Sequence, residues 1–167
     1  MRKITCAAIE AFLQGDEFSF SNTSVVVEPI RPLGPDYVVL RLHGNAIARY
    51  PVETLTTQDH FECFKLLEVS DGGGYQTVTT KERLNGIPDV RVHQKKGQWY
   101  LNGAAWDGSW AFVGKVIAVR KDYRQWSVEY PPLLGREPAV FAMEEPARLF
   151  AQVEAANLGF TVVETSV

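Results

Sequence analysis

The hydrophobic positions of this chain recur at two different spacings, and each spacing predicts a different kind of element. Between Ile4 and Leu13 apolar residues recur every three to four positions, which is typical of an amphipathic helix. We predict a helix over this range, capped by Thr5 at its start and ended by Gly15 in a left-handed conformation.

Much of the remaining pattern alternates or is rich in β-branched and aromatic residues, which predicts short strands joined by tight turns. Turn signatures stand at His43-Gly44-Asn45, at Lys95-Lys96-Gly97 and at Asn102-Gly103, the last of which favours a type I′ turn. The predicted strands cover residues 18–30, 37–42, 46–50, 61–69, 90–94, 98–101, 104–106, 112–120 and 126–130.

Two further helices are predicted. Thr79 and Glu82 form a capping-box pattern, so we expect a short central helix that begins at Thr79 and is ended by Gly86. Residues 144–157 open with two glutamates and a proline and predict a C-terminal helix. The fold class that follows is α+β: a mostly antiparallel β-meander sheet packed by an N-terminal helix and a short central helix, plus a C-terminal helix.

Composition refines this picture only in outline. A chain of 167 residues that is 46% hydrophobic and 22% charged is typical of one soluble domain with a sizeable core. We expect a core over residues 1–130 and a C-terminal extension over 131–167 that packs on it. Neither a signal peptide nor a membrane-spanning run is evident, and Cys6 and Cys63 fit reduced thiols in a cytoplasm better than a disulfide framework.

The formal net charge of -3 conceals a basic middle segment. Residues 81–126 contain nine Lys or Arg against four Asp or Glu, whereas the rest of the chain has eight bases and sixteen acids. One interpretation is a cationic face for a phosphate-bearing or acidic partner. The other is that exposed strands and turns carry Lys and Arg for solubility and edge protection.

Motifs that would indicate catalysis are weak. The histidines stand apart from any coordinating or nucleophilic partner, and the glycines at 72–74 match no phosphate-binding pattern, so they are interpreted as a loop that needs positive φ. Polar residues in turns that could cluster are His43, Asp71 and Asp107. We therefore expect no enzymatic activity, no cofactor and no metal site.

The densest stretch of the chain is Thr79 to Trp110, which holds three of the four tryptophans beside several cations. Burial is the favoured interpretation for Trp99 and Trp106, and an aromatic stacking surface is the alternative. The residues predicted to contact a partner or ligand are Lys81, Arg83, Lys95, Lys96, Tyr100 and Trp110.

Four segments carry a resemblance to a known group of proteins: MRKIT…AFL, LRLHGNAIARY, TTKERLNGIP and QKKGQWYLNGAAWDGSW. Over residues 1–112 the chain resembles a family of small bacteriophage and mobile-element proteins. The resemblance implies a phage or mobile-element setting, in the cytoplasm of a host cell, and it implies no mechanism.

Together these observations predict a binding protein that acts in phage–host conflict or takeover. Its partner would be a host protein or a nucleotide-like small molecule. The alternative is a nucleic-acid-binding module that uses the basic hairpins of residues 81–126, although the acidic net charge counts against it.

Overall fold

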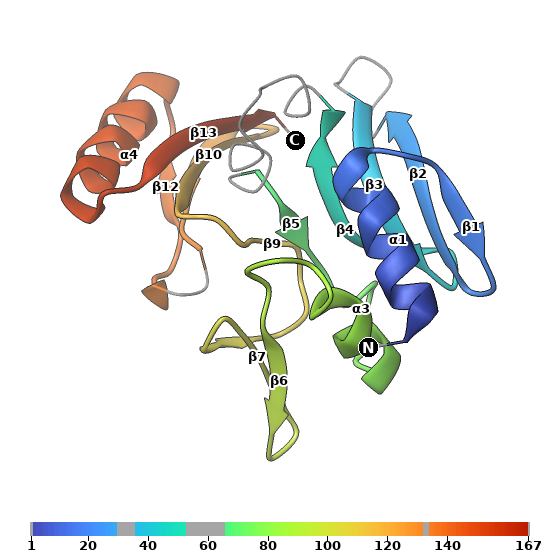
Figure 1. The fold of residues 1–167 in the computed structure, drawn as a ribbon. Helices are drawn as coiled ribbons and strands as arrows, with labels where there is room; N and C mark the ends of the chain where they lie inside the picture. The colour runs from blue at the N-terminus through green and yellow to red at the C-terminus, as the bar shows by residue number, and fades with distance from the viewer. Residues whose placement is uncertain (1, 30–35, 53–65, 132–133, 167) are drawn as a thin grey trace. The chain divides into compact units, whose positions relative to one another are not determined.

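Helices and mostly antiparallel strands make up the chain, which confirms the expected α+β class (Figure 1). The structure is a computed structural model that describes residues 2–29, 36–52, 66–131 and 134–166. It falls into two compact units, Met1–Val113 and Gly114–Val167. This division differs from the boundary expected at residue 130, because two strands that precede residue 130 belong to the second unit.

The first unit contains two of the sheets in the described part of the chain. The larger has strand order β1-β2-β3-β4-β5-β9 and the smaller has β6-β7-β8, and every pairing in them is antiparallel. Their strands are β1 (Phe18–Phe20), β2 (Thr23–Pro29), β3 (Asp36–Leu42), β4 (Asn45–Pro51), β5 (Glu68–Val69), β6 (Val92–Lys95), β7 (Gln98–Leu101), β8 (Ala104–Trp106) and β9 (Ala111–Phe112).

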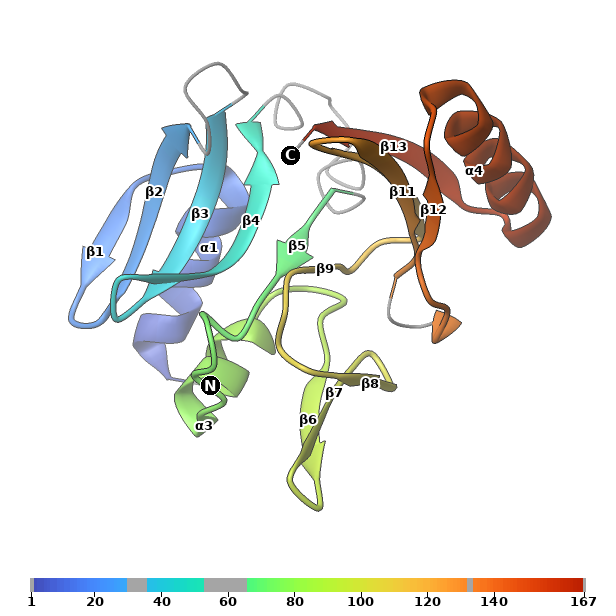
Figure 2. The ribbon, with the colours of Figure 1, turned by 180° about the vertical axis from the view of Figure 1, so that it is seen from behind.

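Helix α1 (Lys3–Gln14) covers one face of the larger sheet, lying in front of it in Figure 1 and behind it in Figure 2. Ala8, Ile9 and Phe12 form its buried hydrophobic stripe. The Phe12 and Tyr50 rings meet edge to face at 5.0 Å, and the Tyr50 hydroxyl donates to the Phe12 carbonyl. The helix ends at Gly15, with φ of 74°, as expected.

The predicted cap of α1 at Thr5 is wrong. Arg2 occupies the N-cap position, and no side chain caps the helix there. Thr5 lies one turn inside, fully buried, and its hydroxyl donates to a carboxylate oxygen of Glu82 at 3.0 Å. Thr5 is of a residue type that can cap a helix, but its hydroxyl binds the side chain of Glu82 on α3 (Val78–Leu84) instead.

The predicted tight turns are confirmed where the structure describes them. His43 and Gly44 have φ values of 51° and 80° between β3 and β4. Asn102 and Gly103 have 49° and 91° between β7 and β8, consistent with the two positive φ angles of a type I′ turn. Of the strand expected over 61–69, residues 61–65 lie outside the described residues, and Glu68–Val69 form β5.

The second unit is a four-stranded sheet packed by one long helix in the described part of the chain. Its strand order is β12 (Ala139–Phe141), β11 (Gln125–Glu129), β10 (Val116–Asp122) and β13 (Thr161–Ser166), with β10 and β13 parallel. Helix α4 (Glu144–Leu158) turns Ala147, Ala151 and Ala155 inwards. These small residues let the helix approach the sheet, where Ile117, Val119 and Val128 complete the core.

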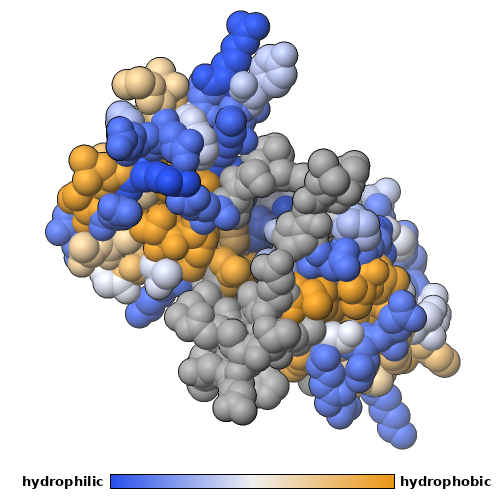
Figure 3. Space-filling view, turned by 90° about the horizontal axis from the view of Figure 1, so that it is seen from above, coloured by the Kyte–Doolittle hydropathy of each residue, from blue (hydrophilic) through white to orange (hydrophobic). Residues whose placement is uncertain are grey.

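The surface mixes residue types. Figure 3 shows hydrophobic and hydrophilic residues interspersed on the face seen from above. Among the exposed hydrophobic residues of the second unit are Val140, Met143, Leu149 and Val153. Within the described ranges, no helix has both the length and the hydrophobicity needed to span a membrane.

Candidate functional site

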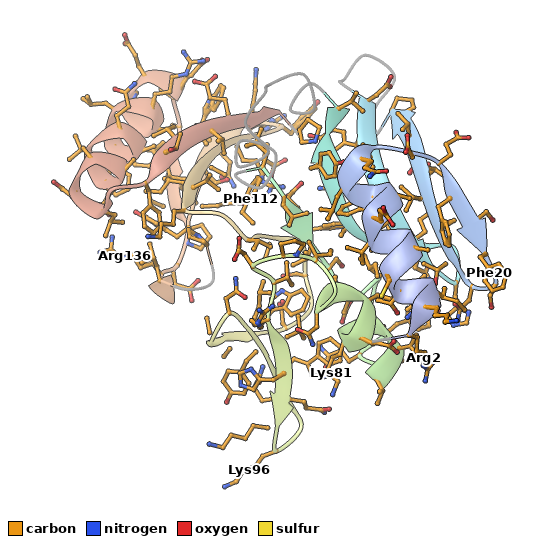
Figure 4. All side chains as sticks on the ribbon, in the orientation of Figure 1. Arg2, Phe20, Lys81, Lys96, Phe112 and Arg136 are labelled. Atoms are coloured by element: carbon orange, nitrogen blue, oxygen red, sulfur yellow. The ribbon has the colours of Figure 1, made fainter. Side chains whose placement is uncertain are left out.

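The β6–β7 hairpin is the centre of the stretch that the sequence singled out, and it projects from the rest of the first unit with Lys96 at its tip (Figure 4). Its turn uses positive φ angles of 50° at Lys96 and 85° at Gly97. The register pairs Val92 with Leu101 and His93 with Tyr100. Paired residues share a face, so the hairpin has an apolar face and a polar face.

The apolar face belongs to the core. Trp99 is fully buried and Trp106 is 4% exposed, and their rings lie 6.2 Å apart. The indole Nε1 of Trp106 donates to the Ser109 carbonyl at 2.8 Å. The interpretation of these two tryptophans as buried is confirmed, and neither ring is open to stack on a ligand.

The polar face carries an aromatic pair beside free cations. The His93 and Tyr100 rings are stacked, with centroids 4.9 Å apart and an interplanar angle of 7°. Lys95 and Lys96 are exposed, and neither ammonium group has a hydrogen-bond or ion-pair partner among the described residues. These four residues, His93, Lys95, Lys96 and Tyr100, are referred to below as the hairpin face.

A side-chain amide closes the outer edge of β6. The Asn85 amide nitrogen donates to the Val92 carbonyl at 2.8 Å, and the Val92 amide donates to the Asn85 oxygen at 2.7 Å. Unpaired strand edges invite pairing with another chain. Because Asn85 pairs with Val92, the backbone groups of Val92 at this edge are not open to another chain. Sequence reasoning missed this role, since it assigned no function to Asn85.

Lys81 is separated from the hairpin face. It lies on α3 (Val78–Leu84), where its ammonium group donates to the Gln94 side chain at 3.2 Å and lies 5.5 Å from the centre of the Trp99 ring. Gln94 and Trp99 are cross-strand partners on the apolar side of the hairpin. Lys81 thus packs against the side opposite to Tyr100, although Figure 4 shows that its end reaches the surface.

The expectation that Arg83 lies at the surface is wrong. Its side chain is 2% exposed, and Nε donates to the Thr23 hydroxyl at 3.1 Å. A second nitrogen donates to the Thr5 hydroxyl and lies 3.5 Å from the Glu82 carboxylate. A guanidinium carries five donors, so it can serve several acceptors at once in a buried site. Arg83 therefore connects α3 to α1 and β2 and is not available to a partner.

The predicted capping box at Thr79 is also wrong. Helix α3 is capped two residues earlier by Thr77, whose hydroxyl oxygen accepts from the Thr80 amide at 3.1 Å. Glu82 instead receives the Thr5 hydroxyl and the Arg2 amide, the latter at 3.2 Å. Burial alone would raise the pKa of Glu82, but these two hydrogen bonds and the charges of Arg2 and Arg83 together lower it below its usual value.

Trp110 lies apart from the hairpin. It is half-buried, and the Arg49 guanidinium lies 4.1 Å from the centre of its ring. Arg49 is in turn paired with Glu68 at 2.9 Å. The structure therefore gathers Lys95, Lys96 and Tyr100 on one surface and leaves Lys81, Arg83 and Trp110 in three other environments.

The glycine run forms a loop around a buried carboxylate. Asp71 is 3% exposed, and its Oδ1 accepts from the amides of Gly73 and Gly74 at 2.9 and 2.8 Å. All three glycines have positive φ, between 82° and 97°, so the interpretation as a positive-φ loop is confirmed. The Gly73 and Gly74 amides that would have to hold a phosphate already bind the carboxylate.

Two pockets adjoin this loop and share Asn45 and Asp71 in their walls. The first, of about 400 Å³, also includes His43, Tyr75 and Thr80, and these five residues define what is called the Asp71 pocket below. The second, of about 540 Å³, includes Asp107 and Trp110. The polar residues noted in the sequence as able to cluster, His43, Asp71 and Asp107, thus lie around one loop.

Asp107 stabilises its own turn. Its Oδ1 accepts from the Ser109 hydroxyl and the Ser109 amide at 2.6 and 2.9 Å, and these hydrogen bonds lower the pKa of its carboxyl. No group of three or more His, Cys, Asp or Glu residues in the described ranges is arranged to hold a metal ion.

Comparison with known proteins gives one family. A family model described as Kyanoviridae Gp96 protein matches residues 1–117, well over half of the chain and nearly all of it within the first unit. No curated protein and no solved structure matches the chain.

Proposed function

Because the chain belongs to the Kyanoviridae Gp96 family of phage proteins, we propose that it is a non-enzymatic binding protein that acts in the host cytoplasm by occupying an acidic surface of a host protein. In that setting it serves host takeover or anti-defence. The observation that carries the proposal is the hairpin face, where two ammonium groups without a partner among the described residues accompany a stacked aromatic pair.

The geometry of the hairpin face suits a protein partner. Tyrosine is enriched among the residues that contribute most to protein interfaces, because it contributes a large rigid area and a hydroxyl at low entropic cost. Stacking on His93 holds the Tyr100 ring in place before binding. Lys95 and Lys96 would accelerate association with an acidic surface and select for it.

The sheet behind the hairpin makes this surface rigid. Trp99 and Trp106 anchor β7 and β8 in the core, and Asn85 holds β6 from its outer edge. A preorganised surface loses little conformational entropy on binding. The loop tip, in contrast, is exposed, so it can enter a concave acidic site without rearrangement of the core.

Nucleic acid remains the alternative partner, and the exposure of Lys95 and Lys96 is what favours it. Affinity for nucleic acid depends on many phosphate contacts. Of the cations expected to make them, Arg83 is buried and Lys81 is engaged with Gln94 and Trp99. The stacked His93 and Tyr100 rings also cover one face of each other, which leaves less aromatic surface for bases. We therefore favour a protein.

The test compares three forms of the full chain as baits in host lysate, with captured proteins quantified by mass spectrometry. The hairpin variant carries Lys95→Glu and Lys96→Glu. The matched control carries Lys121→Glu and Arg124→Glu, the same change in charge at the exposed end of β10 and the turn that follows it in the second unit. We expect a host protein that the wild type and the control capture and that the hairpin variant loses.

Equal capture by all three forms would assign the contact to another surface. Capture that disappears on nuclease treatment would favour the nucleic-acid alternative. If no host protein is enriched by the wild type over beads alone, the proposal fails.

A further inference from the structure

The polar side of the β6–β7 hairpin carries three nitrogen donors in a single row. Arg91, His93 and Lys95 occupy alternate positions and are exposed, whereas Val92 between the first two is 4% exposed and belongs to the core. Arg91 continues the register of β6, because its carbonyl accepts from the Asn102 amide at 2.8 Å. Alternate residues of a strand point to the same face. Arg91, His93 and Lys95 are therefore called the donor row below.

The donor row has no acidic residue of its own. The sequence from 90 to 106 contains neither Asp nor Glu. Among the described residues no carboxylate pairs with the row, and the one hydrogen bond that Arg91 donates goes to the Val90 carbonyl at 3.0 Å. A guanidinium has five N–H donors, so others remain for a partner. A surface of this kind attracts negatively charged groups.

The neighbouring strands leave the donor row open. Tyr100 lies opposite His93 on β7, and Ala105 lies opposite Tyr100 on β8. The His93 ring covers one side of the Tyr100 ring. Ala105 is exposed and has only a methyl group, so it leaves the other side of that ring uncovered. A partner that lies along the row can pack on Tyr100 as well.

The spacing of the donor row favours an extended partner. Same-face residues of a strand lie about 6.6–6.8 Å apart, and an extended partner segment repeats at the same interval. Carboxylates at every second position of such a segment can meet all three donors in step. A helix repeats its face every turn of about 5.4 Å, so it falls out of step with the row by about 2–3 Å over two intervals.

We propose that the donor row binds an extended acidic segment of the partner, in which Asp or Glu side chains at alternate positions meet Arg91, His93 and Lys95. The inference rests on the proposed function and specifies the contact that the partner makes. Because Asn85 binds both backbone groups of Val92, the segment is held by its side chains and not as a strand added along β6.

The test measures binding of two labelled peptides to the full chain by fluorescence anisotropy at low salt. Both peptides have seven residues, three Glu and four Thr. The register peptide has Glu at the first, third and fifth positions, and its isomer has Glu at the first, fourth and seventh. An extended isomer turns its central Glu away from the row. We expect the register peptide to bind at least about threefold tighter, the loss typical of one or two exposed ion pairs.

Single variants locate the contact. Arg91→Gln and Lys95→Gln should each weaken binding of the register peptide about two- to fivefold and reduce its advantage over the isomer. The control is Lys121→Gln, which removes an exposed cation from β10 and should bind both peptides like the wild type.

The inference is overturned if the two peptides bind equally, if neither binds saturably, or if Arg91→Gln and Lys95→Gln keep the full preference. Tighter binding of a seven-nucleotide thymidine oligomer than of the register peptide would assign the row to nucleic acid instead. Equal binding of the peptides, together with a host protein that the Lys95→Glu and Lys96→Glu variant loses, would leave the proposed function standing without the inference. A preference for the register peptide without any captured host protein would do the reverse.

Discussion

Arg83 donates a hydrogen bond to the hydroxyl of Thr5, so a buried arginine on α3 is connected to the first turn of α1. The same Thr5 hydroxyl donates to Glu82, which forms a relay from cation to hydroxyl to carboxylate. Thr5, Glu82 and Arg83, which the sequence suggested as helix caps and surface charge, thus form one internal network. It connects α3, the helix that precedes the β6–β7 hairpin, to α1.

The first prediction concerns Arg83. Arg83→Ala should lower the free energy of unfolding by about 3 kcal/mol, because it leaves buried hydroxyls without their donor and creates a cavity. Chemical denaturation measures this. Lys96→Ala, at the exposed tip, is the control and should change stability by less than about 0.5 kcal/mol. Equal stability of the two variants would show that the buried network contributes nothing.

The second prediction concerns pH and Glu82. Its pKa is lowered in the folded protein, so ionised Glu82 stabilises the fold above the usual carboxyl pKa of about 4.3, and this contribution is lost as the pH falls through the folded value. Wild type should therefore exceed Glu82→Gln in stability near neutral pH, and the difference should shrink on acidification. A difference that stays constant down to strongly acidic pH would rule out this linkage.

The third prediction concerns Gly86, which the sequence suggested as a helix terminator. Here the glycine is required by close packing, since a Cβ would lie 2.9 Å from Ile9 Cγ1 and 3.1 Å from Thr5 Cγ2. Gly86→Ala should cost about 1–3 kcal/mol of stability. Ile9→Ala removes the clashing atom, so the double variant should be more stable than the sum of the single effects predicts. Strict additivity would contradict the steric explanation.

The fourth prediction concerns the edge of the hairpin. Asn85→Asp keeps an acceptor for the Val92 amide but loses the donor to the Val92 carbonyl. Stability should fall by about 1–3 kcal/mol, the cost of an unsatisfied group. Asn85→Ala also leaves the Val92 amide without its acceptor, so hydrogen exchange of the Val92 amide should become faster. Exchange of the His93 amide should change less, because His93 is paired with Tyr100 within the hairpin. Unchanged exchange at Val92 would mean that Asn85 does not close this edge.

Local signals in the sequence were enough for most of the elements, although they missed the strand Ala139–Phe141. Helical spacing located α1. Residue types that tolerate positive φ located the turns at His43-Gly44 and Asn102-Gly103, because these conformations depend on neighbouring residues only. Alternation also placed Trp99 and Tyr100 on opposite faces of β7. The division of the chain and the sheet order depend on long-range packing, which no local pattern reports.

The candidate site was harder to predict for the same reason. The capping-box pattern in TVTTKER favours a cap at Thr79 over the observed cap at Thr77, and only contact with α1 shows that Glu82 and Arg83 point inwards. The sequence named Lys95, Lys96 and Tyr100 but missed the His93 ring beside them, although period-two alternation puts His93 and Lys95 on one face. The two chain segments that line the Asp71 pocket are 24 or more residues apart in sequence, from Ile47 to Asp71, so no motif joins them.

The most direct test of the central claim is the affinity of the purified host protein for the three forms of this chain, measured by calorimetry at low and at physiological salt. The account predicts that Lys95→Glu with Lys96→Glu weakens binding at least about tenfold and flattens its salt dependence, while Lys121→Glu with Arg124→Glu matches the wild type. Equal affinity for all three forms, at either salt concentration, would contradict it.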